Sequence, residues 1–546
     1  AFGASGTIAS TGTTELINYI RGADVHDEDE DGNTSENRRI ICGDPLHSEP
    51  VVVNYGDLDN NPATPDKTMV FFGANDGMLH AVNDEDGTEA WSFIPPDLLP
   101  SLKRILEESE HQYYVDSSPA VLIKDYNKNG IIEPVSTIID GVTYPADIVY
   151  LICGERKGGT SYFALDVTIP AEPEFLWRIA QTDGTPVSTT TIPELGETWS
   201  IPQFGVVKTS AIATGIDVVF LGGGYSEDNS KGKCILAINA STGGIVKEFT
   251  IADDTDMTYS IPSKIFALDR DYNGFTDKLY VGDMGGQIWR IGNFDSTSFP
   301  DGGENIENWT IHKLFTARCN EISCEDTVDN DIDTLTDDTD TSKFFYPPAV
   351  TLEIGYDLVF IGSGDRDDAC NTDTYDTLYA IKDIHNALSL ELDDLVNADS
   401  TALGFTAPDL AESDNGWYLL MEQGDKALAE SVVFNKTLYA TTFLPNNEAC
   451  VPGGYAKLYA LDYLTGAAAF DFDGDGDNDT NEIIGGGLPS KPVVIITETG
   501  VAKLLILTSS TNPDPASDIT SAGVTTTGLE FPVINFFLKW WKEIFN

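Results

Sequence analysis

Basic residues are scarce in this chain, which has 31 Lys and Arg against 89 Asp and Glu and a formal net charge of −58. Such a negative field repels phosphate backbones and anionic lipids, so we expect neither nucleic acid nor an anionic membrane as a partner. The same field favours divalent cations. Hydrophobic residues still make up 41% of the sequence, so the composition is that of a folded protein.

Cysteine is also sparse, with seven residues in 546 and no CxxC pair. Zinc knuckles and thioredoxin-type redox motifs are therefore not supported. We expect buried free thiols plus one or two disulfides, and an odd count leaves at least one thiol unpaired within the chain. Two pairs lie where a disulfide could form: Cys319 with Cys324, and Cys370 with Cys450.

The sequence has no run of 18 apolar residues, so no membrane span is expected. Its first residues, AFGASGTIAS, lack the basic start and long apolar centre of a signal peptide. From these two absences we expect a mature or excised piece of a soluble protein.

Motifs of catalysis are missing as well. The six histidines are scattered without the spacing of HExxH, and there is no G-x-S-x-G elbow and no P-loop. The glycine-rich stretch FLGGGYSEDNSKG joins two expected strands. A phosphate-binding glycine loop leads into the N-terminus of a helix, so we do not expect this stretch to bind phosphate. We expect no enzyme, although carboxylate pairs could converge anywhere in so acidic a chain.

An internal repeat dominates the sequence. A strand opener, Ser-x-Pro or a close variant followed by apolar residues, recurs at 48, 117, 200, 260, 346 and 490, with a copy lacking proline at 430. Each opener precedes a second apolar strand, and six of the seven precede a third, as in GMLHAVN, TSYFALD and AKLYALD. A fourth strand often follows, as in DGTEAWSF.

Seven copies of a three- or four-stranded meander predict an all-β fold, a β-propeller of seven blades. Two packed sandwiches are the alternative, but they would not need so regular an opener. We expect three segments: an acidic N-terminal segment (1–45), the propeller (46–515), and an aromatic-rich closing or docking segment (516–546).

The seventh copy lacks a third strand, which the stretches TELINYIRG or GLEFPVINFFLKWWKEIFN could supply from the two ends of the chain. The second of these concentrates six aromatic residues. Its tail is either a closing element packed on the propeller or an exposed docking element for a partner protein.

The stretch DRDYNGFTD lies between two apolar runs and has the ligand spacing of an EF-hand-type loop. Oxygen donors occupy positions 1, 3, 5 and 9, a backbone carbonyl occupies position 7, and glycine occupies position 6. Position 12 is a tyrosine in place of the usual glutamate. The expected ligands of Ca²⁺ are Asp269, Asp271, Asn273, the carbonyl of Phe275, and Asp277.

Two further loops have similar spacing. The stretch DFDGDGDNDTNE matches the full pattern, although a free acidic linker would look the same; its candidate ligands are Asp471, Asp473, Asp475, Asp477, Asp479 and Glu482. The stretch DYNKNGIIE carries fewer charges, with Asp125, Asn127, Asn129 and Glu133 as candidates. Acidic runs at 24–33 and 326–340 have irregular spacing, typical of solvated loops.

The stretch FFGANDGMLHAVNDEDGTEAWSFIPPDLLPSL (71–102) resembles the propeller domain of the PilC/PilY family of type IV pilus biogenesis factors and tip adhesins. Supporting stretches are GDPLHSEPVVV (43–53), GGTSYFALDVT (158–168), ETWSIPQFG (197–205) and ALDRDYNGFTDKLYVGDMGGQIWRI (267–291). The similarity covers about residues 15–510.

This resemblance implies a modified seven-bladed propeller whose single family calcium loop falls on residues 269–277. It also implies an extracellular protein that is exported through the periplasm and is located with minor pilins at the pilus tip. In the family the ion controls pilus extension and retraction, and the protein contacts host cells or abiotic surfaces. The variable N-terminal half of the family and its Arg-Gly-Asp motif have no counterpart in the sequence, so their functions do not carry over.

Two other interpretations stay open. LHAVNDEDGTEAW also resembles the blade motif of pyrroloquinoline-quinone dehydrogenases, although only this copy is close to the motif and no vicinal Cys-Cys is present. A carbohydrate-binding or purely structural propeller is the third possibility.

Overall fold

The computed structural model describes residues 10–27, 30–38, 41–58, 61, 66–107, 111–182, 190–212, 214–293, 305–317, 342–386, 388–398, 414–446, 453–472, 474–496, 501–508 and 523–532. By internal contacts the chain divides into two compact units. The first is Ala1–Ala267 with Gly274–Thr276 and Glu304–Glu307, and the second is the remainder.

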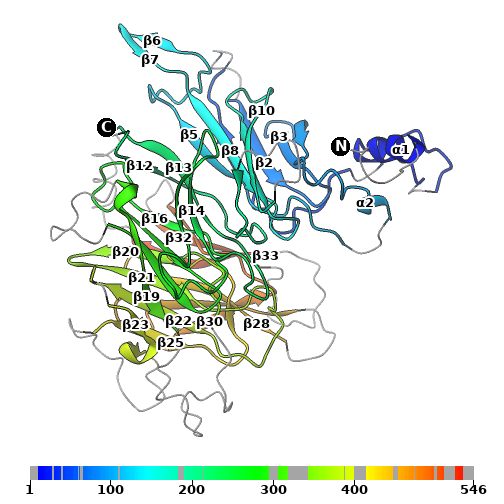
Figure 1. Cartoon of the computed structure of the whole chain (residues 1–546). Coiled ribbons are helices and arrows are strands. Elements are labelled where there is room, and N and C mark those ends of the chain that lie inside the picture. Colours follow the sequence, from blue (N-terminus) through cyan, green and yellow to red (C-terminus); the bar gives the residue numbers. More distant parts are fainter. Residues whose placement is uncertain are drawn as a thin grey trace. The chain divides into compact units, whose positions relative to one another are not determined.

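The first unit contains three antiparallel meanders in chain order (Figure 1). The first sheet is β1 (Val51–Asn54), β2 (Thr68–Gly73), β3 (Leu79–Asn83) and β4 (Glu89–Phe93). The second is β5 (Ala120–Lys124), β8 (Ile148–Gly154), β9 (Ser161–Asp166) and β10 (Glu174–Ala180), with β11 (Thr190–Thr191) added in parallel. The third is β12 (Gln203–Val207), β13 (Ile216–Gly222), β14 (Ile235–Asn239) and β15 (Ile245–Phe249). A separate ribbon joins β6 (Thr137–Ile139) and β7 (Val142–Tyr144), and the helices are α1 (Ser10–Ile20) and α2 (Arg104–Glu107).

Four more sheets follow, largely within the second unit. The fourth is β16 (Phe266–Leu268), β17 (Lys278–Gly282), β18 (Gln287–Gly292), β19 (Thr310–Thr316) and β23 (Leu390–Glu391), and the fifth is β20 (Ala349–Glu353), β21 (Tyr356–Gly362), β22 (Thr377–Asp383), β25 (Gly416–Leu420) and β24 (Val396–Asn397). The sixth contains β26 (Lys426–Ala427), β27 (Val432–Phe434), β28 (Thr437–Pro445), β29 (Gly454–Asp462) and β30 (Asn481–Gly486); the seventh is β31 (Val493–Ile496), β32 (Val501–Thr508) and β33 (Gly523–Pro532). Short 3₁₀ turns are η1 (Ile306–Asn308) and η2 (Leu392–Asp394).

Six of the seven openers found in the sequence lead into the first strand of a sheet, and the proline-free copy forms β27, which follows β26 in the sixth sheet. The third strand of the seventh sheet is β33, and the predicted C-terminal stretch, which begins at Gly528, supplies the second half of this strand. The other candidate was wrong as a strand, because residues of TELINYIRG lie in the helix α1, where Leu16 and Ile20 recur at a helical spacing. The tail beyond 532 lies outside the described residues.

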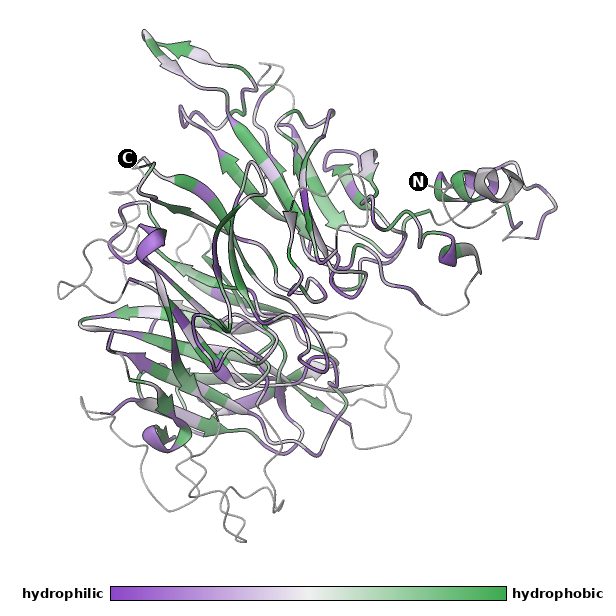
Figure 2. Ribbon diagram, in the orientation of Figure 1, coloured by the Kyte–Doolittle hydropathy of each residue, from purple (hydrophilic) through white to green (hydrophobic). Residues whose placement is uncertain are grey.

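Strand alternation lets one strand serve two cores. On β8, Leu151 packs in the core shared by the first and second sheets, while its neighbour Ile152 packs in the core shared by the second and third. Leu438 and Tyr439 on β28 divide in the same way between the cores on either side of the sixth sheet. Each such side chain contributes on the order of 1.5–3 kcal/mol to the stability of the fold by burial. Figure 2 shows hydrophobic residues in green along the strands.

The serine of the opener recurs because its hydroxyl makes two hydrogen bonds that link neighbouring sheets. Ser48 Oγ accepts the backbone N–H of Gly73 at 2.8 Å and donates to the carbonyl of Ser117 at 2.9 Å, in the next opener. Ser200 donates in the same way to the carbonyl of Ser263 at 2.9 Å and accepts the N–H at the end of β13. One hydroxyl therefore ties its own sheet to the following one.

Tryptophans on the fourth strands make a second link between consecutive sheets. Their indole N–H groups donate to carbonyls that follow the third strand of the next sheet: Trp91 to Pro170 at 2.8 Å, Trp177 to Ala240 at 2.8 Å, and Trp417 to Tyr463 at 3.1 Å. Trp91 is the tryptophan of the dehydrogenase-like motif, and here it joins two sheets.

No helix among the described residues is long and apolar enough to cross a membrane.

Glu155 is a fully buried carboxyl in the first unit. Burial and the neighbouring Asp97 raise the pKa of Glu155 well above its usual value. Asp97 is itself engaged by Arg178, whose Nε donates to it at 3.1 Å, and by Ser161 Oγ at 2.6 Å. Glu155 therefore holds its proton in the folded protein at a pH where an exposed glutamate is ionised.

A raised folded-state pKa contributes stability that is complete below the pKa of the unfolded chain and is lost as pH rises through the folded value. We expect Glu155→Gln to raise the urea midpoint of unfolding, with a gain that grows between about pH 5 and pH 8. The exposed Glu172→Gln is the control and should show no such trend. A gain for Glu155→Gln that is equal at both pH values would contradict the buried neutral carboxyl.

Candidate metal centre

The loop 269–277 connects β16 to β17, the first two strands of the fourth sheet. Asp277 N–H donates to the Leu268 carbonyl at 2.8 Å, which closes the base of the hairpin. Thr276 N–H donates to the Val206 carbonyl at 2.8 Å, and the ring of Phe275 lies under Lys208, whose Nζ is 4.1 Å from the ring centroid. The segment is thus a structured turn held by backbone contacts.

Three carboxylates converge in this loop. One oxygen from each of Asp269, Asp271 and Asp277 lies within 4.8 Å of the others. Asp277 is buried while Asp271 is exposed, so the cluster reaches from the base of the hairpin to solvent. Asn273 joins them, because its N–H donates to Asp269 and to Asp271, each at 3.1 Å. Carboxylates this close repel one another unless a cation or protons offset their charge.

Arg270, the second residue of the loop, fixes its position. Its backbone N–H donates to Asp277 Oδ2 at 2.7 Å. Its side chain points the other way, where Nε donates to Asp357 Oδ1 at 2.8 Å and Nη2 donates to the carbonyl of Glu353 at 3.0 Å. A single residue therefore connects the acidic loop to the hairpin between β20 and β21.

Asp357 belongs to a buried ionic cluster. Lys278 Nζ lies 3.0 Å from Asp357 Oδ2 and 3.5 Å from Asp383 Oδ2, and the hydroxyl oxygen of Tyr280 lies within hydrogen-bonding distance of both carboxylates, at 2.9 and 2.7 Å. Tyr280 stands at position 12 of the loop, where an EF-hand has glutamate. Its hydroxyl is committed to this cluster, so the departure from the EF-hand pattern has a structural cause.

Asp357, Asp383 and His385 also offer atoms at metal-binding distances. Arg290 forms an ion pair with Asp383, so the two carboxylates already face three cations: Arg270, Lys278 and Arg290. Burial opposes ionisation of Asp383, but its hydrogen bond to His385 and the nearby cations lower its pKa. Positive charge already balances the carboxylates, so this cluster does not need a metal ion.

The three expected loops share left-handed backbone at two of their positions. Positions 4 and 6 are left-handed in each, with φ of +58° and +90° at Tyr272 and Gly274, +57° and +81° at Lys128 and Gly130, and +78° and +102° at Gly474 and Gly476. The acidic run at 24–33, interpreted from sequence as irregular, has the same pair at Glu30 (+60°) and Gly32 (+88°) when Asp27 is taken as position 1. Gly32 N–H donates to Asp27 at 2.9 Å, as Gly130 N–H donates to Asp125 at 2.8 Å.

The loop that starts at Asp125 also brings its candidate donors together. The side-chain amides of Asn127 and Asn129 lie 2.6 and 3.2 Å from the carboxylate of Glu133. The N–H of Tyr126, at position 2, donates to the carboxylate of Asp147 at 2.9 Å. In the 269–277 loop, Asp277 accepts the N–H of position 2 in the same way. Sequence spacing could not find Asp147, because it stands just before β8, beyond the β6–β7 ribbon.

The loop with the best spacing connects β29 to β30. Asp471 accepts the N–H groups of Gly474 at 2.7 Å and Gly476 at 3.0 Å, and Asp479 accepts the N–H of Phe472 at 3.0 Å. Asp473 lies outside the described residues. Among the described residues, the acidic side chains of this loop form no group of three at metal-binding distance, whereas those of the 269–277 loop do.

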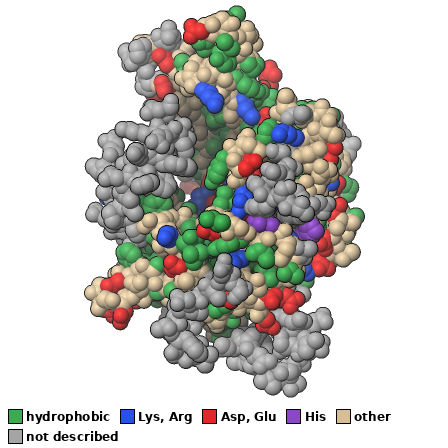
Figure 3. All heavy atoms as spheres, turned by 90° about the vertical axis from the view of Figure 1, so that its left-hand side faces the viewer, with side chains coloured by type: hydrophobic (Ala, Val, Ile, Leu, Met, Phe, Trp, Pro, Cys, Tyr) green, Lys and Arg blue, Asp and Glu red, His purple; other side chains and the backbone are tan. Residues whose placement is uncertain are grey.

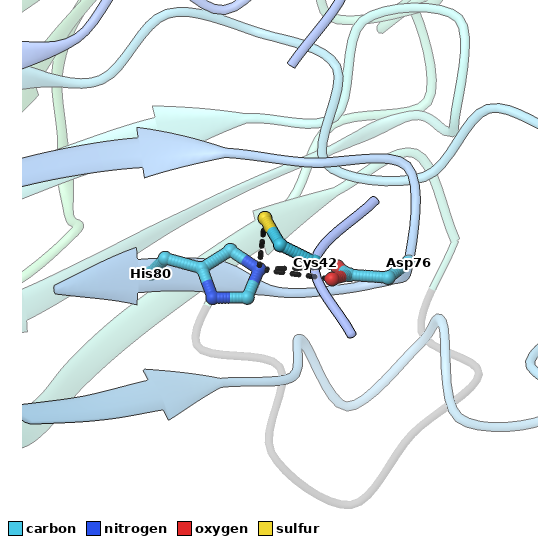
Figure 4. Close-up of side chains that lie close together, drawn as sticks. All are labelled: Cys42, Asp76 and His80. Atoms are coloured by element: carbon cyan, nitrogen blue, oxygen red, sulfur yellow. Dashed lines mark hydrogen bonds and ion pairs between the residues drawn. The ribbon is translucent and has the colours of Figure 1, made fainter. Parts of the chain in front are cut away.

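The structure also brings together residues that the sequence interpretation had left apart. Cys42, Asp76 and His80 each place one ligand atom within 4.8 Å of the others (Figure 4). Burial would lower the pKa of His80, but the hydrogen bonds and charges of Asp76 and Cys42 outweigh burial and raise it to about 10. The only sequence signal was the four-residue separation of Asp76 and His80 across a turn, with Cys42 far upstream.

The four described cysteines, Cys42, Cys153, Cys234 and Cys370, are free thiols, in keeping with the expectation of buried free thiols for the middle two. Cys319, Cys324 and Cys450 lie outside the described residues, as does the acidic run at 326–340.

Comparisons with known proteins find similarity to PilY1 proteins. Residues 48–308 match the family model of the PilY1 beta-propeller domain. The chain is 26% identical over 524 residues to a type IV pilus biogenesis factor PilY1 homolog of Xylella fastidiosa, covering 84% of this chain and 32% of the relative. It is 25% identical over 571 residues to the type IV pilus biogenesis factor PilY1 of Pseudomonas aeruginosa, covering 88% of this chain and 44% of the relative. The chain thus spans from about a third to under half of the length of these relatives.

A solved structure shows the fold. The C-terminal domain of Pseudomonas aeruginosa PilY1 matches with a TM-score of 0.53 and 23% sequence identity, over 80% of this chain and 90% of that domain. The meanders described above therefore form a β-propeller, and the all-β propeller predicted from the repeat is confirmed.

Arg270 offers a test of how the loop is anchored. Arg270→Gln should lower the free energy of unfolding by about 1–3 kcal/mol, because Asp357 loses a charged partner while Lys278 remains. The substitution keeps the backbone N–H that Asp277 accepts. Urea denaturation measures the effect, and Arg366→Gln, in a partly exposed loop, is the control. Equal midpoints for the two variants would show that the Arg270 pair does not contribute.

Proposed function

We propose that this chain, which is similar to PilY1 type IV pilus biogenesis factors over most of its length, is a calcium-binding propeller of a pilus-tip protein. In this proposal Ca²⁺ binds first at the 269–277 loop and acts as a structural signal in pilus assembly and retraction. The observation that carries the proposal is the convergence of Asp269, Asp271 and Asp277 at the base of a hairpin.

The donor set suits calcium better than other ions. Ca²⁺ takes six to eight oxygen ligands in flexible geometry, and this loop offers oxygen donors alone. Asp269, Asp271, Asn273, the carbonyl of Phe275 and Asp277 would hold the ion. Since Tyr280 replaces the usual glutamate, the remaining coordination falls to water or to a second oxygen of these carboxylates. Magnesium would demand a stricter octahedral arrangement.

Arg270 suggests how the ion would influence the protein. The loop carboxylates repel one another without a cation, and Asp277 also accepts the N–H of Arg270. The side chain of Arg270 is bonded to Asp357. Loss of calcium would therefore disturb a residue that is anchored in the buried ionic cluster, and the disturbance would extend to the hairpin between β20 and β21.

The partners and location follow from the family and from the charge of the chain. We propose minor pilins at the pilus tip as partners, a host or abiotic surface as the contacted target, and an extracellular location reached through the periplasm. Among the described residues, acidic side chains stand at several separate places on the face in Figure 3. The proposed role is non-catalytic, and the loops at 125 and 471 are further candidates for calcium.

Asp277→Asn tests the calcium site directly. The variant keeps the size of the side chain and an oxygen that can accept the Arg270 N–H, but it removes one negative charge from the cluster. We expect calorimetry to show one calcium site lost or weakened at least tenfold, which is about 1.4 kcal/mol. The rise in melting temperature that calcium gives the wild type should shrink accordingly.

The matched control is Tyr272→Asn in the same loop. Tyr272 is exposed, stands at position 4, where no ligand is expected, and has a left-handed φ that asparagine tolerates. This variant should bind calcium like the wild type. If Asp277→Asn retained both the stoichiometry and the affinity of the wild type, the 269–277 loop would not be the site.

The pilus role has its own test in a bacterium that carries the full-length protein. Asp277→Asn should change how surface motility by pilus retraction depends on external calcium, while Tyr272→Asn should not. Secreted protein levels are measured in parallel to exclude loss of the protein. A variant that has lost calcium in calorimetry but moves normally at every calcium concentration would separate ion binding from pilus control.

A further inference from the structure

Cys42, Asp76 and His80 converge from three places in the first unit. Cys42 lies in the segment before β1, Asp76 lies in the turn between β2 and β3, and His80 is on β3 (Figure 4). His80 Nε2 is 3.9 Å from Cys42 Sγ and 3.0 Å from Asp76 Oδ2. One nitrogen thus faces a thiol and a carboxylate, both of which are ligands of transition metals.

These separations are close to the edges of a tetrahedral site. With Zn–S of about 2.3 Å and Zn–N and Zn–O of about 2.0 Å, tetrahedral geometry puts nitrogen about 3.5 Å from sulfur and about 3.3 Å from oxygen. The observed 3.9 and 3.0 Å differ from these values by a few tenths of an ångström. An ion could therefore enter with small side-chain adjustments.

The surroundings hold the three ligands in place. Asp76 accepts the N–H of Gly43 at 2.8 Å and the N–H of Met78 at 3.1 Å. The segment can approach so closely because residue 43 is glycine, since a Cβ there would lie 2.4 Å from Asp76 N. A second hydrogen bond joins this segment to the turn, because the side-chain amide of Asn75 donates to the carboxylate of Asp44 at 2.9 Å.

His80 has the outer contact typical of a metal-binding histidine. Its Nδ1 lies 3.2 Å from Glu89 Oε2, on the side of the ring opposite the cluster. A carboxylate on the second nitrogen fixes the tautomer that presents a lone pair at Nε2, and it makes the imidazole a stronger ligand. The ring is also buried and stacks on Phe72, with centroids 5.2 Å apart.

We propose that Cys42, Asp76 and His80 form a binding site for a first-row transition-metal ion, with Zn²⁺ the best match. A thiolate and an imidazole do not suit Ca²⁺, which prefers oxygen ligands, so this site differs in chemistry from the acidic loops. On binding, the thiol proton and the Nε2 proton leave to solvent. Two negative ligands and one neutral ligand then meet a divalent ion.

The arrangement leaves the fourth coordination position to water or another donor, because Cys42 is exposed. A bound ion would cross-link the segment before β1 to the β2–β3 turn. The competing arrangement is a metal-free ion pair, in which a protonated His80 sits between Asp76 and Glu89.

Co²⁺ is the probe that distinguishes the two arrangements, because a thiolate bound to cobalt gives a charge-transfer absorption in the near ultraviolet. The purified, tag-free chain is titrated with Co²⁺ without oxygen and in excess Ca²⁺, which saturates the oxygen-only loops. We expect one equivalent of Co²⁺ to produce the band and one equivalent of Zn²⁺ to abolish it. Cys42→Ser should lose the band, and His80→Gln should weaken binding at least tenfold.

Cys370→Ser is the matched control, because Cys370 is the other exposed free thiol among the described residues. It should leave the band unchanged. Glu89→Gln should keep the band but weaken Zn²⁺ binding by about 10–100-fold, as loss of an outer-shell carboxylate does. Urea midpoints measured without metal confirm that each variant is folded.

Thiol alkylation gives an independent readout. Zn²⁺ should protect Cys42 from alkylation and leave Cys370 reactive. The proposal is overturned if the wild type shows neither band nor protection, since the cluster is then the metal-free ion pair. It is also overturned if the band survives Cys42→Ser or disappears in Cys370→Ser. None of these outcomes depends on whether the 269–277 loop binds calcium.

Discussion

Burial of both faces of each small sheet is the constraint on which the rest of the structure depends. A three- or four-stranded sheet has too little core of its own, so alternate side chains of one strand enter the cores on its two sides, as Leu151 and Ile152 do. The opener serine and the fourth-strand tryptophan then join consecutive sheets by hydrogen bonds that run in the same direction along the chain. Because these links occupy the strands and their ends, the hairpin turns are left free to vary, and the acidic sequences are found there.

The turns use their freedom in a common way. Three of these loops and the acidic run at 24–33 before β1 have left-handed residues at their fourth and sixth positions, and the first carboxylate accepts backbone N–H groups of the turn. The loops differ in the residues from other segments that bond to them. The 269–277 loop is backed by Arg270 and the buried cluster around Asp357, whereas the loop at 125 depends on Asp147. These interior contacts, more than ligand spacing, distinguish the loop at 269, because they connect the proposed calcium-binding turn to the interior.

Two kinds of metal chemistry coexist in the proposals made for this chain, and the donor atoms separate them. Oxygen-only turns at the surface suit a hard ion that exchanges readily, as a calcium signal requires. A thiol and an imidazole beside a buried strand suit a borderline-soft ion that holds two segments together. The strongly negative charge of the chain raises the local concentration of any divalent cation, but it does not choose among them.

The sequence by itself determined the repeat, the all-β propeller class and the 269–277 loop, because strand period, turn residues and ligand spacing are local properties of the chain. It could not choose which terminus closes the seventh sheet, since TELINYIRG and the C-terminal stretch are both apolar enough to pair. Nor could it rank the loops correctly by geometry, since the loop at 471 has the better spacing while the described donors of the loop at 269 converge. Only the tertiary structure decided that Arg270 bonds to Asp357, that Asp147 accepts the N–H of Tyr126, 21 residues earlier, and that Cys42 lies beside His80. The reason is physical: these contacts join residues distant in the chain, and strand pairing sets their distances, which no local pattern encodes.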